Sequence, residues 1–311
     1  MVSYRLNLSM VPTMMIKEYL ERQRKKIEEA LHRLIPTPLS PFTDHIESMR
    51  YSLFAGGKRI RPILCLAAAE AVGCDDRSME KLLPVACALE CIHTYSLIHD
   101  DLPAMDNDDL RRGKPTNHIR YGEAAAILAG DGLLTLAFDL ITARSSSNLE
   151  AEVLLKITNI IAKASGSFGM VGGQALDIAC ENTDYPFEML QTIHRNKTGA
   201  LIIASIHAGA IGGGATPVQI ASLLTYGEQI GLAFQIVDDL LNVVSTTEQL
   251  GKKAGSDKEK GKATYPAYFG IEETRAKALH ASTQAQDALI SFDNQAEPLR
   301  ALAQYIYTRS H

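Results

Sequence analysis

Apolar residues recur every three or four positions along most of the chain, and this spacing constrains the fold more than any other feature. It is clear in IKEYLERQRKKIEEALHRL (16–34) and in TPVQIASLLTYGEQIGLAFQIVDDLLNVV (216–244). Alternation with a period of two is absent from the sequence, and clusters of β-branched residues are few. The pattern predicts an all-α protein. Further helices are predicted over 78–101, 123–142, 149–167, 187–212 and, as two or three pieces, 272–309.

The breaks between these segments are short and rich in glycine and proline, and no linker or internal repeat divides the 311 residues. We therefore expect a single domain over 1–311, a bundle of roughly ten helices of ordinary length, with a ragged start over 1–15. The segment EAAAILAGDGLLTLAFDLIT (123–142) is small and apolar almost all round. It predicts either a central buried helix or a subunit interface, and the interface alternative favours a homodimer.

The composition argues against several classes of function. The formal net charge of -5 gives no basic excess for nucleic acid or an anionic membrane surface. Apolar runs fall short of the ~18 residues that a membrane span needs. The five cysteines form no CxxC pair and lie mostly in apolar helical sequence. We expect a reduced, cytoplasmic protein with no membrane span and no nucleic-acid partner.

A cluster of acidic residues ends the predicted helix 78–101, in HDDLPAMDNDDLRRGKPT. Asp100 and Asp106 are six residues apart, about 240° around an ideal helix, and would not share a face. Pro103 disrupts helical hydrogen bonding, so a kink or extra loop there can return Asp106 to the side of Asp100 and Asp101. We expect Asp108 and Asp109 to be solvated or paired with nearby cations.

A second acidic cluster, QIVDDLLN (235–242), ends another apolar helix. Asp238 and Asn242 share a helix face, with Asp239 beside them and Gln235 one turn earlier. Carboxylates at a helix C-terminus interact unfavourably with the helix macrodipole. The simpler interpretation is that each cluster is a solvated helix end, and the occurrence of two acidic C-termini argues against it. Two facing sets of hard oxygen ligands suit Mg²⁺, with Mn²⁺ as a substitute, and a polyphosphate between them.

Basic residues lie beside the glycine-rich breaks, near the acidic clusters. Arginine matches phosphate oxygens in a bidentate way, and lysine supplies a point charge. Any one of them is more often a solvated surface charge, but their repeated position favours an anion site. The candidates are Lys58, Arg59, Arg61, Arg111, Arg112, Lys197 (followed by Thr198), Lys252, Lys253 and Lys262.

Six motifs, GGKRIRP, HDDLPAMDNDDLRRGKPT, GGQALD, NKTGAL, FQIVDDLLN and GKATYP, stand in the order found in trans-prenyl diphosphate synthases. The chain resembles this family from about residue 40 onward, and its DDxxxxD spacing is most similar to the bacterial farnesyl diphosphate synthase branch. The resemblance implies the isoprenoid synthase fold, with a deep central cavity, a homodimer and three Mg²⁺ per active site. It also implies condensation of isopentenyl diphosphate with dimethylallyl and then geranyl diphosphate to give farnesyl diphosphate.

The resemblance assigns residues to two diphosphate sites. Isopentenyl diphosphate, the homoallylic substrate, would be held by Lys58, Arg61, His93 and Arg112. The metals would be held by Asp100, Asp106 and Asp238, with Asp101 in support. The allylic diphosphate would be bound by Arg111, Lys197, Lys252 and Lys262. Thr198 and Gln235 would direct oxygens toward the carbocation, Gln174 and Asp177 would support the site, and Arg309 would close over the homoallylic diphosphate.

One position departs from the family pattern. The second motif is DDxxD in the family, but its last position here is Asn242. An amide oxygen can coordinate without adding negative charge. We therefore expect weaker binding of the third Mg²⁺, with activity retained through Asp238.

Product length is expected to depend on Tyr95 and Ser96, five and four residues before Asp100. A tyrosine there should block elongation beyond C15, unless Tyr95 is simply core packing. The nearest alternative is a geranylgeranyl diphosphate synthase, because close relatives share every motif except this floor. A terpene cyclase would need one diphosphate site, so GGKRIRP argues against it. A non-catalytic prenyltransferase subunit would be expected to lack aspartates of the first motif.

Overall fold

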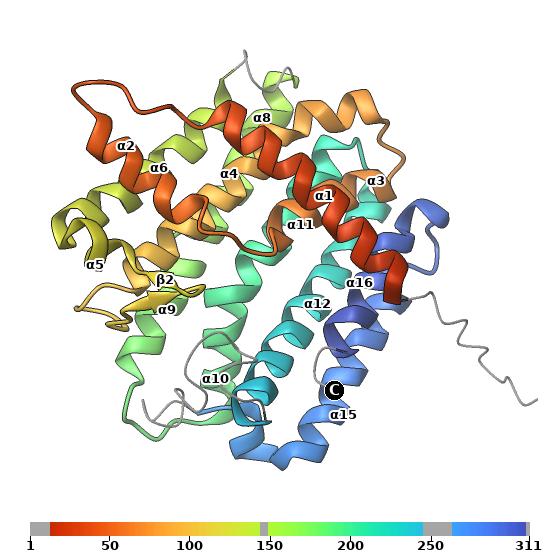
Figure 1. Cartoon of the computed structure of the whole chain (residues 1–311). Helices are drawn as coiled ribbons and strands as arrows, with labels where there is room; N and C mark the ends of the chain where they lie inside the picture. The colour runs from red at the N-terminus through yellow and green to blue at the C-terminus, as the bar shows by residue number, and fades with distance from the viewer. Residues whose placement is uncertain (1–12, 144–148, 245–262, 309–311) are drawn as a thin grey trace, which may run out of the picture.

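The computed structural model describes residues 13–143, 149–244 and 263–308, and helices dominate all three ranges (Figure 1). Within these ranges the strands are the two-residue β1 (Leu110–Arg111) and β2 (Lys114–Pro115), which form one antiparallel hairpin. The predicted all-α class is confirmed. The single domain over 1–311 stays a prediction.

The helices follow one another through short connections. In chain order they are α1 (Thr13–Leu34), α2 (Thr43–Leu53), α3 (Ile60–Ala71), α4 (Asp76–Asp100), α5 (Asn117–Tyr121), α6 (Glu123–Thr142), α8 (Ala151–Ser165), α9 (Met170–Ala179), α10 (Phe187–His194), the π-helix η1 (Arg195–Gly199), α11 (Ala200–Gly212), α12 (Pro217–Val244), α15 (Tyr265–Asp287), the 3₁₀ turn η2 (Asn294–Ala296) and α16 (Glu297–Thr308).

Periodicity located most of these helices but not all of their details. The bounds of α6 agree with the expected 123–142, whereas the expected helix 187–212 is interrupted by η1. The sequence did not single out α2, α3, α5 or α9. Helix α1 begins at Thr13, so part of the expected ragged start is helical, and residues 1–12 lie outside the described ranges.

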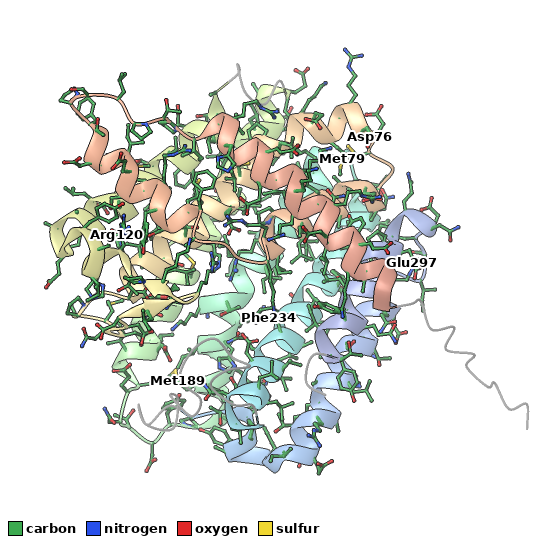
Figure 2. All side chains as sticks on the ribbon, in the orientation of Figure 1. Asp76, Met79, Arg120, Met189, Phe234 and Glu297 are labelled. Carbon is green, nitrogen blue, oxygen red and sulfur yellow. The ribbon has the colours of Figure 1, made fainter. Side chains whose placement is uncertain are left out.

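Helix α4 is the central element that carries the first aspartates. Its N-terminus is capped by Asp75, whose carboxylate accepts from the Ser78 backbone N–H at 2.8 Å. Figure 2 shows Asp76 and Met79 at this end of the helix, opposite to the end at Asp100. Along its length α4 packs against α1, α3, α6 and α11. Burial on these sides holds the aspartate end of α4 in a fixed place.

Two apolar clusters form the core, and both include residues of α3 and α11. One is centred on α4 and α6 and the other on α12, α15 and α16. Leu66 and Leu201 belong to the first cluster, whereas their sequence neighbours Ala67 and Ile202 belong to the second. Helices α3 and α11 therefore join the two halves of the core around the site described below.

Two helices, α4 and α6, are long and apolar enough to cross a membrane by length and composition, a test that core helices also pass. In α4, 78% of the most apolar window is buried in the chain, as expected of a core helix. In α6 the share is 39%. Much of the apolar surface of α6 is therefore left uncovered by its own chain.

Candidate active site

The chain turns back on itself directly after α4. The backbone N–H of Met105 donates to the Leu102 carbonyl, and that of Asp106 donates to the Asp100 carbonyl, both at 2.8 Å. Burial raises the pKa of Asp100 to about 6, while the charge of Lys197 opposes this rise and that of Asp106 adds to it. The predicted return of Asp106 to the side of Asp100 is confirmed, and Pro103 lies in the turn that makes it.

Asp101 and Arg111 form a partly buried ion pair. Both carboxylate oxygens of Asp101 accept from Arg111 Nε, at 2.7 and 2.8 Å, and Nη2 donates to Oδ1 at 2.5 Å. Asp101 is 3% exposed, whereas the Arg111 side chain is 31% exposed, so the carboxylate side of the pair is the shielded one. Asp108 lies farther away, with Oδ2 at 3.6 Å from Arg111 Nη2. Asp101 therefore orients Arg111, and its support of the metals stays a prediction.

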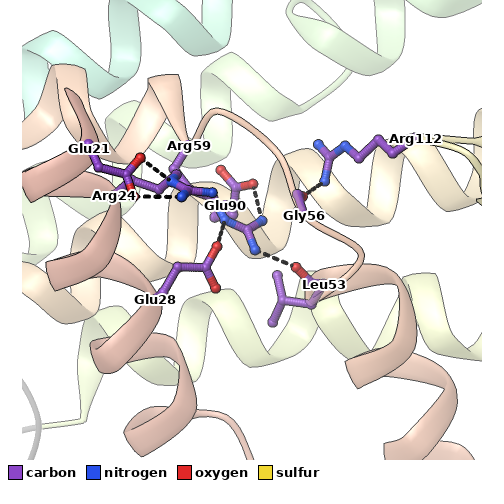
Figure 3. Close-up of polar contacts among 8 residues, drawn as sticks. All are labelled: Glu21, Arg24, Glu28, Leu53, Gly56, Arg59, Glu90 and Arg112. Carbon is purple, nitrogen blue, oxygen red and sulfur yellow. Dashed lines mark hydrogen bonds and ion pairs between the residues drawn. The ribbon is translucent and has the colours of Figure 1, made fainter. Parts of the chain in front are cut away.

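The neighbouring Arg112 points to a different place because it lies in the turn of the β1–β2 hairpin. Arg112 and Gly113 have φ of 54° and 74°, the left-handed pair that a tight two-residue hairpin requires. Arg112 Nη1 donates to the carbonyl of Gly56, as Figure 3 shows. A side chain at Gly57 would begin 2.7 Å from the guanidinium carbon of Arg112. Gly57 therefore makes room for this arginine, and Gly56 supplies the carbonyl that accepts its hydrogen bond.

Arg61, His93 and Arg112 form a cluster of cationic and polar groups beside the hairpin. Burial lowers the pKa of Arg61 to about 10, with Glu90 and Asp238 opposing the shift and Arg112 adding to it. Burial and then the charge of Arg61 lower the pKa of His93 well below its usual value. Arg61 Nε is buried without a hydrogen-bond partner. The cluster therefore has a donor and positive charge that suit a bound anion.

Arg59 has a different role from the two basic residues around it in the sequence. It is 2% exposed, and Glu28 and Glu90 accept from its Nε and Nη1 at 2.7 Å (Figure 3). Its Nη2 donates to the Leu53 carbonyl, also at 2.7 Å. Arg59 was a candidate for the anion site, and that interpretation is wrong, because the guanidinium is already committed to these partners.

Lys197 and Thr198 lie in the π-helix η1. Lys197 Nζ is 2.7 Å from Asp177 Oδ2, so Asp177 orients the lysine, a pairing that was not predicted. A Cβ at Gly173 would overlap the backbone nitrogen of Lys197, which means that α9 approaches η1 closely only because position 173 is glycine. Single π-turns in helices are frequent at functional sites.

A cavity of about 370 Å³ joins several of the predicted residues. It is lined by Arg61, His93, Tyr95, Ser96, Leu97, His99, Asp100, Met105, Met170, Val171, Gln174, Ala175, Ile178, Lys197 and Thr198. Gln174 Oε1 is buried without a partner, and Tyr95 is 5% exposed. The apolar wall of Met105, Met170 and Ile178 was not predicted, because Met105 comes from the turn after α4 and the other two residues come from α9, far away in the sequence.

The two aspartates of the second motif face different surroundings. Asp238 is exposed, whereas Asp239 is buried and accepts from the Tyr265 backbone N–H at 2.9 Å. Its other oxygen lies 4.0 Å from Nε2 of His194. Asp239 therefore anchors the start of α15, directly after the GKAT segment. Asn242 is also buried, at 4% exposure.

Several predicted residues are not among those that line this cavity. Gln235 lines a second cavity of about 470 Å³, with His194, Glu228 and Tyr265. Lys58 is exposed in the loop before α3. Lys252, Lys262 and Arg309 lie outside the described residues.

The carboxylates fit a divalent cation that shares its ligands with a substrate. Within the described ranges, no group of three or more His, Cys, Asp or Glu side chains is arranged as a metal cage. Asp100 and Asp106 nonetheless lie side by side, and the raised pKa of Asp100 marks a charge that the protein compensates incompletely. Mg²⁺ typically takes one or two carboxylates and completes its coordination with water and phosphate oxygens.

Comparisons with known proteins agree with this geometry. The polyprenyl synthetase family model matches residues 44–296. The chain is 48% identical over 294 residues to a geranylgeranyl diphosphate synthase of Cyanophora paradoxa, covering 94% of this chain and 96% of that protein. It is 46% identical over 296 residues to a farnesyl diphosphate synthase of Geobacillus stearothermophilus, covering 95% and 98%.

Solved structures extend the match to the fold. The crystal structure of an FPP/GFPP synthase from Zymomonas mobilis in its apo form superposes with a TM-score of 0.84 at 37% identity. The match covers 95% of this chain and all of that one. The motifs, the shared cavity and these matches lead to one conclusion: the chain belongs to the polyprenyl synthetase family and is a prenyltransferase of the trans-prenyl diphosphate synthase type.

Proposed function

We propose that the chain condenses isopentenyl diphosphate with dimethylallyl and then geranyl diphosphate to give farnesyl diphosphate and release diphosphate. One observation carries the proposal. A single cavity joins Arg61, with its buried unpartnered Nε, to Asp100 and Lys197. Such a cavity suits two anionic substrates, one bound by cationic side chains and the other through carboxylates and metal ions. A condensation of two diphosphates requires two such sites.

The homoallylic diphosphate would bind to the cationic cluster without metal. Arg61 and Arg112 form no ion pair with a carboxylate of the described residues, so their charge can be used for the ligand. His93, held neutral by its surroundings, would donate or accept a hydrogen bond and not supply charge. Lys58, in the exposed loop before α3, would reach the diphosphate from outside.

The allylic diphosphate would bind at the aspartate side of the same cavity. Asp100, Asp106 and Asp238 would hold Mg²⁺, which supplies Lewis-acid stabilisation of the leaving diphosphate when it is bound. Arg111, oriented by Asp101, and Lys197, oriented by Asp177, would add cationic contacts to the same oxygens. The protein supplies electrostatic stabilisation and no nucleophile.

The remaining steps need an apolar chamber. After the allylic C–O bond breaks, the alkene of isopentenyl diphosphate would attack the cation and a proton would leave to the released diphosphate. The Thr198 hydroxyl, in the cavity beside Lys197, would orient toward the positive charge. Met105, Met170 and Ile178 would exclude water that could otherwise quench the cation.

We also propose that the chain is a homodimer, formed over the uncovered apolar face of α6. Ile127 and Leu128 of this helix are 45% and 57% exposed in the single chain. Sedimentation equilibrium should report twice the mass of 33.9 kDa, and a monomer at micromolar concentration would contradict the proposal.

Product length is the finer part of the proposal. Tyr95 lines the cavity and is almost fully buried, which supports its role as a floor at C15. The second candidate is geranylgeranyl diphosphate synthesis, which is favoured by the relative from Cyanophora paradoxa.

The test is to incubate the protein with Mg²⁺, isopentenyl diphosphate and C5, C10 or C15 allylic diphosphates, and to size the products. C15 as the main product, lengthened in Tyr95→Ala, supports the proposal. C20 as the main product would favour the second candidate, and an unchanged Tyr95→Ala profile would remove Tyr95 as the floor. No condensation with any primer would refute both candidates.

A further inference from the structure

His99 lines the cavity one helical turn nearer the aspartates than Tyr95. It is the first residue of HDDLPAMDNDDLRRGKPT, but no role was predicted for it. Its Nε2 lies 3.0 Å from the backbone carbonyl of Ile127 in α6. Because a carbonyl oxygen only accepts, Nε2 carries the proton and donates this bond. The Tyr95 and His99 rings meet edge to face, with their centroids 5.7 Å apart. The two rings therefore form one continuous aromatic surface along α4.

The position of the His99 ring depends on a glycine in the facing helix. A Cβ added to Gly130 of α6 would overlap Nε2 of His99, and the ring atoms Cε1 and Cδ2 would lie within 3.0 Å of it. Glycine is less favourable than alanine inside a helix, so a buried glycine in α6 calls for a packing reason. The reason here is that Gly130 leaves the recess into which the imidazole ring fits.

We propose that His99, held in the recess at Gly130, forms a second wall of the product chamber, and that this pair limits product length together with Tyr95. The inference rests on the proposed condensation activity. Any side chain at position 130 would displace the ring from α6 and toward the cavity that it lines. Removal of the ring would instead widen the cavity one turn above Tyr95, beside the growing chain.

The test is to size the products of the wild type, His99→Ala, Gly130→Ala and the double variant, from geranyl diphosphate, isopentenyl diphosphate and Mg²⁺. We expect His99→Ala to shift the main product by at least one C5 unit toward longer chains. Gly130→Ala should raise the share of unextended C10 at least threefold. The double variant should extend chains at least as far as the wild type, because it lacks the His99 ring that Gly130→Ala would push into the cavity.

Gly132→Ala is the matched control. It lies in the same helix, but its added Cβ would meet the flexible ends of Met49 and His45 and not the cavity wall. Its product distribution should equal that of the wild type.

The ratio of product lengths is the deciding readout, since a merely structural role would change the rate or the stability and leave this ratio unchanged. An unchanged ratio in His99→Ala, with the wild type active, would overturn the inference while the proposed function stood. If Gly130→Ala does not fold, His99→Ala decides alone, because it leaves α6 unaltered. Failure of the wild type to condense any primer would overturn the proposed function itself.

Discussion

Replacement of Asp100 by asparagine is predicted to stabilise the metal-free protein while it abolishes turnover. The pKa of Asp100 rises from 3.8 to about 6 on folding, with burial as the main cause. At 1.36 kcal/mol for each pKa unit, the ionised carboxylate costs the fold up to about 3 kcal/mol. Because the folded pKa is the higher one, this cost is fully present above about pH 6 and disappears as the pH falls below 3.8.

Asparagine has nearly the same shape and no charge, so Asp100→Asn should recover most of that free energy of unfolding at pH 8. For 311 residues, an unfolding entropy of about 2.1 cal/mol/K per residue converts about 3 kcal/mol into a rise in Tm of about 5 °C. At pH 5 the gain should fall to roughly half. Turnover should fall at least a hundredfold, because the variant loses a proposed metal ligand.

The assay is thermal unfolding by circular dichroism in EDTA, at pH 8 and pH 5, beside product formation with Mg²⁺. Asp109→Asn is the control, since Asp109 is exposed, and its Tm should stay within about 1 °C of the wild type. A lower Tm for Asp100→Asn at pH 8, or a gain that does not depend on pH, would refute the reasoning from burial.

Three further predictions follow from the site and its surroundings. Gly57→Ala should displace Arg112 and raise the KM for isopentenyl diphosphate about 10- to 100-fold, measured at saturating allylic substrate; an unchanged KM would exclude Arg112 from that subsite. Burial lowers the pKa of His194 from 6.5 to about 4, so the free energy of unfolding should fall by up to about 3 kcal/mol as the pH drops from 6.5 to 4. Urea unfolding at several pH values should show this fall for the wild type and a smaller fall for His194→Gln. An equal dependence of the unfolding free energy on pH in both proteins would contradict the prediction. Asn242→Asp should lower the Mg²⁺ concentration for half-maximal turnover severalfold, and an unaltered Mg²⁺ dependence would show that position 242 does not influence the metals.

Local patterns in the sequence predicted those features that depend on local physics. The bounds of α6 follow from its own apolar pattern, and the return of Asp106 to Asp100 follows from the effect of Pro103 on the helix. The family motifs gave Asp177 only as a supporting residue, and its ion pair with Lys197 was not predicted.

Features that depend on distant partners could not be predicted. Arg59 looks like Arg61 in the sequence, but Glu28 and Glu90, each 31 residues away, bury it in ion pairs. Gln235 shares an approximate helix face with Asp238, yet it lines a separate cavity beside His194. Helical spacing gives the direction of a side chain to within tens of degrees. The packing of α12 against α11 and η1 determines which cavity Gln235 lines.

The central claim is that one cavity holds two diphosphates by different means, and isothermal titration calorimetry tests it most directly. Isopentenyl diphosphate and a non-ionisable thio analogue of geranyl diphosphate would each be titrated into the protein with Mg²⁺ or with EDTA. We predict that EDTA weakens binding of the allylic analogue at least a hundredfold and leaves binding of isopentenyl diphosphate within about threefold. Arg61→Gln should weaken binding of isopentenyl diphosphate and leave binding of the allylic analogue nearly unchanged. Equal dependence of both ligands on Mg²⁺, or no loss of isopentenyl diphosphate binding in Arg61→Gln, would contradict the account.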